Sequence, residues 1–195
     1  MQTKYVIGLD YGTLSARAVL VSVCGGEVMA ESVYPYPHGI LSMIPGRAEK
    51  LPGDFALQEI DDYVEAMYHT IPAVVEKSHC SVEDIIGIGI DATSSTFLPL
   101  LENGVPLCRT EKFCSHPHAQ LKLWKHHGAQ EEADRITELA VGRQEKFLMR
   151  CGGKVNAEWM LPKLMEIAGK APDVYEATDN FMEVSDYLVY LLTGE

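Results

Sequence analysis

The segment formed by residues 6–21 constrains the fold more than any other part of the chain, because an apolar run, a short polar turn and a second apolar run follow each other directly. This pattern predicts two strands joined by a turn. The polar and small residues of the turn are Asp10, Gly12, Thr13 and Ser15. A glycine lets the backbone approach a ligand closely, while hydroxyl and N–H groups can face phosphate oxygens. The turn, with Arg17 close behind it, is a candidate phosphate site; a plain β-hairpin is the alternative.

The composition argues for a protein that handles small molecules. The chain has 195 residues, of which 47% are hydrophobic, enough for one domain with a sizeable core or for a piece of a larger one. Its net charge of −12 argues against a surface for nucleic acid or anionic membrane. The N-terminus lacks signal-peptide features, and no apolar run has the length of a membrane span. Five widely spaced cysteines predict reduced thiols and a cytoplasmic location.

Alternating and apolar runs predict a sheet that starts in the first part of the chain. Strands are expected at Tyr5–Leu9, Arg17–Val23 and Glu27–Tyr36. They are expected to be antiparallel neighbours, because the turn at residues 24–26 favours a hairpin. The segment 37–55 is rich in Pro and Gly and is expected to be irregular. Apolar residues at helical spacing from Ile60 to Val74 then predict an amphipathic helix.

A second strand end repeats the chemistry of the first. The apolar run at residues 85–90 predicts a strand that is buried on both faces and ends at Asp91. The hydroxyl residues that follow it are Thr93, Ser94, Ser95 and Thr96. Ligands of α/β sheets collect beyond the carboxyl ends of strands. Because Asp10 and Asp91 both come at such ends, the sequence favours a binding site in a mixed α/β sheet that helices cover.

Beyond this strand, the sequence predicts a hairpin and then mainly helices. Residues 97–101 and 105–107 flank an Asn-Gly pair, which is a strong hairpin signal. Helices are expected at His118–His127, Gln130–Ala140, Glu158–Ile167 and Ser185–Leu192.

Several motifs are distinctive, and they extend along nearly the whole chain. The turn at residues 8–18 and the Asp-Tyr-Leu and Leu-Thr-Gly segments at 186–188 and 192–194 resemble features shared by the FGGY family of carbohydrate kinases. The Tyr-Pro-His-Gly segment at 36–39 and the Lys-Leu-Trp-Lys-His-His run at 122–127 resemble one branch of that family, whose substrate is the ketopentose ribulose. The segment 91–96 departs from the sequence that is usual in this branch.

The resemblance implies a ribonuclease-H-like α/β fold of the actin and hexokinase type, with a mixed sheet flanked by helices. Residues 1–195 would form part of the N-terminal domain of a two-domain kinase, which passes the γ-phosphoryl group of ATP to a sugar hydroxyl with Mg²⁺. It implies that Asp10, Gly12 and Thr13 bind phosphate, with Asp10 acting on the metal; Ser15 and Arg17 are added from the residue pattern. The residues expected to line the sugar side are Asp91, Thr93, Ser94, Ser95, Thr96, Lys125, His126 and Glu158.

The general base of such kinases is an Asp later in the first domain, and their adenine site lies in the second domain, so the resemblance places no catalytic base within residues 1–195. We therefore expect the chain alone to have no sugar kinase activity, since phosphoryl transfer requires both substrates to be aligned. Exposed core is expected to favour a homo-oligomer or aggregation. Another FGGY sugar or polyol kinase of the xylulose type and a non-catalytic sugar-binding module are the alternatives.

Other polar and aromatic residues have a structural interpretation. The histidines at 116, 118, 126 and 127 lack the carboxylate or Cys spacing of a metal site and are interpreted as hydrogen-bonding groups. Trp124 is interpreted as a core anchor. Glu158 is equally compatible with a sugar contact and with a position in the first turn of a helix, where the helix dipole favours an acid.

Overall fold

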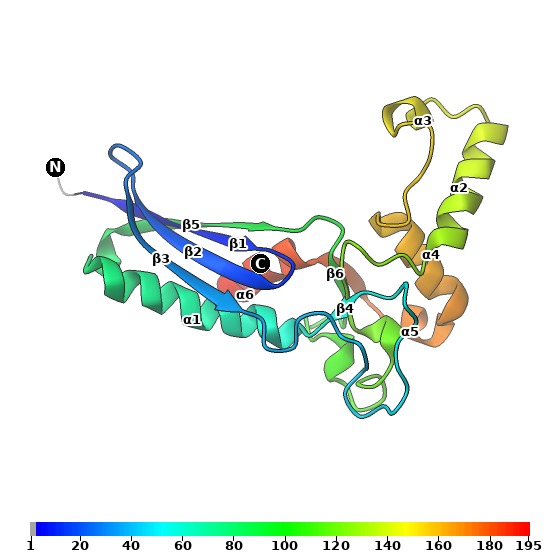
Figure 1. Ribbon diagram of the computed structural model, residues 1–195, viewed down its shortest axis with the longest axis horizontal. Coiled ribbons are helices and arrows are strands. Elements are labelled where there is room, and N and C mark those ends of the chain that lie inside the picture. The colour runs from blue at the N-terminus through cyan, green and yellow to red at the C-terminus, as the bar shows by residue number, and fades with distance from the viewer. Residues whose placement is uncertain (1–2) are drawn as a thin grey trace. The chain divides into compact units, whose positions relative to one another are not determined.

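The computed structural model describes residues 3–195, which divide into two compact units (Figure 1). Unit 1 comprises the residues up to Ile40, Glu59–Thr93 and Val184–Glu195, and unit 2 comprises Leu41–Gln58 and Ser94–Glu183. The candidate residues are therefore divided between two bodies. The predicted phosphate turn and Asp91 belong to unit 1, whereas the predicted sugar residues from Ser94 onward belong to unit 2.

Unit 1 is built on a four-stranded mixed sheet. Its strands are β1 (Tyr5–Tyr11), β2 (Ser15–Ser22), β3 (Val28–Pro35) and β5 (Ile85–Ala92), in the order β3-β2-β1-β5. β2 pairs antiparallel with β1 and β3, and β5 pairs parallel with β1. The expected antiparallel neighbours and the mixed sheet are confirmed, because a short turn joins each of the first strands while a helix returns the chain to β5.

Helix α1 (Ile60–Ser78) covers one face of this sheet and contacts β3, β2 and β1 (Figure 1). The ring of Tyr63 in α1 stacks on Tyr11 of β1 and on Tyr36, with centroid distances of 5.6 and 4.8 Å. Side chains alternate along a strand, so Ile7 and Leu9 face α1 together with Tyr11, and all three are at most 2% exposed. The even-numbered residues of β1 therefore face away from α1.

The expectation that β5 is buried on both faces is wrong. Ile86 is 60% exposed and Ile88 is 43% exposed, because β5 is an edge strand within the described residues and α1 packs mainly on β3 and β2. Helix α6 (Val184–Thr193), predicted at nearly the same bounds, contacts β5. The register of β5 shifts by one residue at its start: Tyr5 pairs with Ile85 but Val6 pairs with Gly87.

Unit 2 contains a smaller, antiparallel sheet with helices. The strands are β4 (Leu57–Gln58), β7 (Leu121–Lys122), β6 (Phe97–Leu100) and β8 (Asn180–Glu183), in the order β4-β7-β6-β8. The helices are α2 (Gln130–Gly142), α3 (Phe147–Arg150), α4 (Met160–Lys170) and α5 (Pro172–Ala177). Three short 3₁₀ helices, of which the first lies in unit 1, cover Val82–Asp84, Leu107–Arg109 and Pro117–Ala119.

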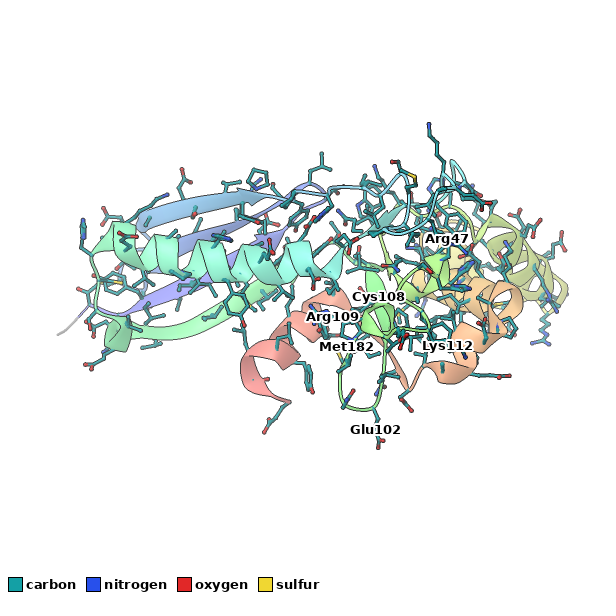
Figure 2. The ribbon with its side chains drawn as sticks, turned by 90° about the horizontal axis from the view of Figure 1, so that it is seen from below. Arg47, Glu102, Cys108, Arg109, Lys112 and Met182 are labelled. Atoms are coloured by element: carbon teal, nitrogen blue, oxygen red, sulfur yellow. The ribbon has the colours of Figure 1, made fainter. Side chains whose placement is uncertain are left out.

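Two predicted elements of unit 2 differ from the structure. The helix expected at His118–His127 is wrong: the segment holds the end of a 3₁₀ helix, the strand β7 and turns, because Leu121 and Lys122 pair with β4 and Lys122 also pairs with β6. The Asn-Gly pair does turn the chain, with Leu101 N–H donating to Val105 O at 2.9 Å. Its second strand is reduced to one bridge between Leu100 and Pro106. Figure 2 shows Glu102 at the outer tip of this turn.

The other expected segments agree more closely. Residues 37–55 are irregular apart from one isolated bridge between Met43 and Lys50. Helix α2 begins at Gln130 as expected, whereas α4 begins at Met160, two residues after the expected start. Between residues 3 and 195, we find no helix with the length and apolar character needed to span a membrane.

Candidate functional site

The two carboxylates that the sequence singled out lie side by side in unit 1. The parallel register of β1 and β5 pairs Asp10 with Asp91 and, two residues earlier, Gly8 with Gly89. All four residues are on the face of the sheet that points away from α1. An open hollow of about 370 Å³ follows this face, lined by Gly8, Leu9, Asp10, Arg17, Val19, Gly89, Ile90 and Asp91. Asp10 and Asp91 thus lie at one end of this open face, beside Gly8 and Gly89, which add no side chains to it.

Arg17 approaches Asp10 from the other side. The antiparallel register of β1 and β2 pairs the two residues, and Arg17 Nε lies 3.3 Å from Asp10 Oδ2. Both side chains are more than half exposed, at 59% and 54%. Such a pair contributes about 0–1 kcal/mol to folding stability, so both groups can turn to a ligand at small cost.

The turn between β1 and β2 is held by its own backbone. Gly12 N–H donates to Ser15 O at 3.0 Å, and a Cβ on Gly12 would lie 3.3 Å from that oxygen. A larger residue would therefore press on the turn. Thr13 and Ser15 are half-buried, with Ser15 the first residue of β2. The predicted phosphate residues thus lie together on one short, accessible turn.

The second strand end is tied directly to the first. Thr93 N–H donates to the Tyr11 carbonyl at 3.3 Å, just past the end of both strands. Tyr11 precedes the phosphate turn and Thr93 follows Asp91, so the two predicted segments of unit 1 are fixed to each other by backbone contacts.

The donor set at the strand ends suits a hard divalent cation. Mg²⁺ is usually held by one or two carboxylates together with phosphate oxygens and water, rather than by a cage of protein ligands. Asp10 and Asp91 supply two such carboxylates on one open face. Within residues 3–195, no group of three or more His, Cys, Asp or Glu side chains is placed to hold a metal ion. Only a metal that also takes ligands from substrate and water suits this arrangement.

The predicted sugar residues at 94–96 form a constrained loop in unit 2. Ser94 is exposed, and Ser95 has a left-handed backbone with φ of 58°. The N–H of Ser95 donates to Glu183 Oε1 at 3.1 Å. Thr96 is fully buried, and its Oγ1 accepts from the N–H of Trp124 at 3.1 Å. Ser94 therefore offers its hydroxyl to solvent, whereas that of Thr96 lies inside the unit.

Two further predicted sugar residues have access to solvent. Lys125 is half-buried, as is its neighbour Trp124. Glu158 precedes α4, which begins at Met160, so the alternative that placed it in the first helical turn is wrong. Its carboxylate lies 2.8 Å from His127 Nε2, in a pair whose side chains are 29% and 55% exposed.

His126 occupies a different environment from the other predicted sugar residues. It is 0% exposed, and its Nδ1 accepts from the N–H of Ala56 at 3.2 Å. Its Nε2 is then the donor, 2.9 Å from Glu166 Oε2. With both ring nitrogens engaged inside unit 2, His126 has no free group for a sugar. We therefore leave His126 and the buried Thr96 out of the site proposed below.

The cluster around His126 was not predicted. Lys122, His126 and Glu166 are all 0% exposed, and Lys122 Nζ lies 3.1 Å from Glu166 Oε2. Among the described residues, Glu166 Oε1 and His118 Nδ1 have no hydrogen-bond partner. The sequence carried one signal of this cluster: Glu166 lies among the apolar residues of the predicted helix at 158–167, at a core position where a charge needs a partner.

The protonation of this cluster follows from its burial. Burial, together with the charge of Lys122, lowers the pKa of His118 to about 3. Burial also lowers the pKa of His126 to about 4 and that of Lys122 to about 8. Burial alone would raise the pKa of Glu166, but the His126 hydrogen bond and the Lys122 charge lower it to about 2. At neutral pH the cluster holds neutral histidines, a carboxylate and an ammonium group.

Comparison with known proteins identifies the family. The family model described as the N-terminal domain of FGGY carbohydrate kinases matches residues 5–195. The chain belongs to this family. Two of its relatives are the ribulokinases of Geobacillus thermodenitrificans and Anoxybacillus flavithermus, which are 47% and 46% identical to it over 196 residues. Each match covers 100% of this chain and 35% of the relative, so the chain spans about a third of the relatives' length.

Solved structures of a xylulose kinase and a glycerol kinase share the fold. The xylulose kinase from Rhodospirillum rubrum superposes with a TM-score of 0.73 at 22% identity, covering 98% of this chain and 34% of that structure. The glycerol kinase from Plasmodium falciparum gives a TM-score of 0.65 at 12% identity, covering 98% of this chain and 35% of that structure. At these identities the likeness concerns the fold alone, and it confirms the predicted ribonuclease-H-like α/β fold of the actin and hexokinase type.

Proposed function

We propose that the protein containing this chain transfers the γ-phosphoryl group of ATP to a ketopentose, converting ribulose to ribulose 5-phosphate. The observation that carries the proposal is the register that places Asp10 beside Asp91 on the open face of the sheet. The ribulokinases at 46–47% identity over the whole chain support the choice of sugar.

In this proposal the turn after β1 binds the phosphates of ATP. Gly12 allows the phosphate chain to approach the backbone, and Thr13 and Ser15 offer hydroxyl and N–H donors. Arg17, whose Nε lies 3.3 Å from Asp10 Oδ2, adds positive charge beside the phosphates.

Asp10 and Asp91 are the residues that would hold Mg²⁺ and orient the sugar. Asp10 would hold the metal, and Asp91, at the same level of the next strand, would accept a hydrogen bond from a hydroxyl of the sugar. When bound, Mg²⁺ neutralises the charge that develops on the transferred phosphoryl group. The protein's own contribution is alignment, because in-line transfer depends mainly on the positions of the reacting groups.

Within unit 2, this proposal assigns sugar contacts to the accessible polar residues. Ser94, Lys125 and Glu158 present a hydroxyl, an ammonium group and a carboxylate that solvent can reach. Hydroxyl-rich ligands are recognised by such a mixture of donors and acceptors. Thr93 of unit 1 is also proposed as a sugar residue, because the hydrogen bond from its N–H to the Tyr11 carbonyl holds it beside the strand ends.

We further propose that residues 1–195 are part of the first domain of a two-domain kinase and that they do not turn over sugar alone. Relatives of about three times this length support this, since the chain covers 35% of each. Purified chain is expected to give no ATP-dependent sugar phosphate above background, measured with radiolabelled ATP. Turnover that co-purifies with this polypeptide would contradict the proposal.

The function is tested by Asp10→Asn in the full-length protein. Loss of the carboxylate is expected to lower kcat for ribulose about 100-fold, because the charge that orients the metal is gone. Stability should stay within about 1 kcal/mol of wild type, since Asp10 is exposed and only weakly paired. Activity is measured with a coupled ADP assay and stability with urea unfolding.

The matched control is Asp134→Asn on the exposed face of α2, where the carboxylate accepts a hydrogen bond from Gln130. It should leave kcat within about twofold of wild type, because it contacts no candidate residue. Full activity of Asp10→Asn would overturn the proposed role of the strand end. A substrate panel decides the sugar: phosphorylation of xylulose or a polyol in place of ribulose would reassign the substrate, and binding without turnover would indicate a sugar-binding module.

A further inference from the structure

Lys163 is a buried lysine of α4, and no carboxylate of residues 3–195 forms a direct ion pair with it. Its side chain is 0% exposed, and its Nζ donates to three backbone carbonyls, those of Ser95 at 2.9 Å, Leu123 at 2.9 Å and Trp124 at 3.1 Å. An ammonium group has three donors, so these three acceptors satisfy it completely. A buried cation is costly unless it is fully hydrogen-bonded, so the place of Lys163 in the interior depends on these three carbonyls.

The three carbonyls belong to two segments that are far apart in the sequence. One is the loop 94–96 and the other is the segment 123–125. A second contact joins the same two segments, because Thr96 Oγ1 accepts from the Trp124 N–H at 3.1 Å. Lys163 thus fixes the spacing of a loop that carries Ser94 and a segment that carries Lys125, both of them candidate sugar residues.

The loop needs such support because its backbone is strained. Ser95 has φ of 58°, a left-handed conformation that costs a residue other than glycine about 1–2 kcal/mol. Its N–H is held by Glu183 at 3.1 Å and its carbonyl by Lys163 at 2.9 Å. Strained residues persist only where their surroundings fix them on both sides. The two charged groups provide this, one at each end of Ser95.

We propose that Lys163 is a positioning residue, which holds the loop 94–96 and the segment 123–125 in one conformation so that the sugar binds in a single orientation. The proposal rests on the proposed function, since it assigns these segments to the sugar. The role of Lys163 goes beyond the proposed function, because this residue contacts no substrate and acts only through backbone carbonyls. Burial and the neighbouring charge of Lys122 lower the pKa of Lys163 to about 7, in keeping with its place in the interior.

The test compares Lys163→Met with Lys170→Met in the full-length protein. Lys170 lies on the same helix, is 40% exposed and donates to one carbonyl, that of Gly128, at 3.0 Å, outside both segments. Lys163→Met is expected to raise KM for ribulose about tenfold while KM for ATP changes less than about twofold, because a misplaced loop disturbs only the sugar. Lys170→Met should leave both constants within about twofold.

A second readout does not depend on activity. Hydrogen exchange at the amides of Ser95 and Trp124 should be faster in Lys163→Met than in wild type, and unchanged in Lys170→Met. If Lys163→Met fails to fold, Thr96→Val takes its place, because this substitution removes the other contact between the two segments. A raised KM for ribulose with an unchanged KM for ATP is then the expected result.

The outcomes separate the two proposals. A wild-type protein that phosphorylates no sugar would overturn the proposed function. An active wild type, with a folded Lys163→Met variant whose KM for ribulose and amide exchange equal those of wild type, would overturn the role of Lys163. A parallel rise in both KM values would also contradict it, because that result indicates a general loss of structure.

Discussion

The two units bury charge in different ways. In unit 1, each buried carboxylate has a partner that reaches solvent: Asp84 is paired at 2.8 Å with Lys4, which is 40% exposed, and Asp62 at 2.7 Å with His38, which is 57% exposed. In unit 2, Lys122 and Glu166 are both 0% exposed. Water screens the pairs of unit 1 and cannot reach the cluster of unit 2. Each buried carboxylate of unit 1 thus keeps a partner in contact with water, whereas Lys122 and Glu166 of unit 2 are paired wholly inside the unit.

The largest effect is expected from removing one partner of a buried pair. Lys122→Met leaves the Glu166 carboxylate inside unit 2 without its ammonium partner and should lower the free energy of unfolding by about 3–5 kcal/mol. Lys4→Met removes a pair of unit 1 whose N···O distance is 2.8 Å and whose lysine is 40% exposed to water, and it should cost about 1 kcal/mol or less. Urea unfolding of both variants measures the difference. Equal losses would show that the two units do not differ in this respect.

The second largest difference between the units is expected in how their stability changes as the pH falls. The pKa of His126 in the folded state is about 4 against an ordinary value of 6.5, and that of Glu166 is about 2 against 4.5. Because both folded values lie lower, the unfolded state takes up protons first, so unit 2 loses stability as the pH falls from about 6.5 towards 4 and further towards 2.

His38 in unit 1 should respond in the opposite direction. Its hydrogen bond to Asp62 raises the pKa of His38, so its contribution is present below pH 6.5 and is lost as the pH rises through the folded value. This effect is small, because His38 is mostly exposed. Amide exchange at pH 7 and pH 5, corrected for intrinsic rates, follows each unit separately. Unchanged protection in unit 2 at pH 5 would count against this account.

A smaller effect is expected from added volume. A Cβ on Gly128 would lie 2.6 Å from Glu166 Oε1 and 2.7 Å from His126 Nε2, so Gly128→Ala should cost about 1–3 kcal/mol. In unit 1, a Cβ on Gly89 meets nothing within 4 Å, and Gly89→Ala should be neutral or stabilising by up to about 1 kcal/mol. Thermal unfolding distinguishes the two. A neutral Gly128→Ala would mean that the buried cluster can move aside.

The sequence predicted unit 1 better than unit 2 for a physical reason. The strands of unit 1 are long enough for alternation to be read, and the two Asp residues at strand ends follow from that reading. The strands β4 and β7 of unit 2 have two residues each, which is too short to show a periodicity. The sequence therefore predicts a helix for residues 118–127, where the structure has β7. Tertiary pairing decided that segment, and local pattern could not.

The candidate site residues of unit 1 could likewise be predicted better than those of unit 2. The pairing of Asp10 with Asp91 could be expected from two similar strand ends, because parallel neighbours bring their carboxyl ends together. The burial of His126 could not be expected, since a histidine beside Lys125 and His127 in the sequence looks equally suited to a surface loop. Its environment is set by Glu166 of α4, which lies 40 residues later in the sequence and contacts His126 only in the folded unit.

The register that β5 keeps after the one-residue shift at its start has a consequence at the opposite end of that strand. Ile86 is the extra residue, lying between the pairs Tyr5–Ile85 and Val6–Gly87. Since side chains alternate, removing a residue between Gly87 and Asp91 would send the carboxylate of position 91 through to the face that α1 covers. The two acids are therefore matched by the count of residues from Gly87, about 13 Å upstream at about 3.3 Å per residue, so a deletion within 87–91 would separate them, whereas loss of Ile86 would leave their register intact.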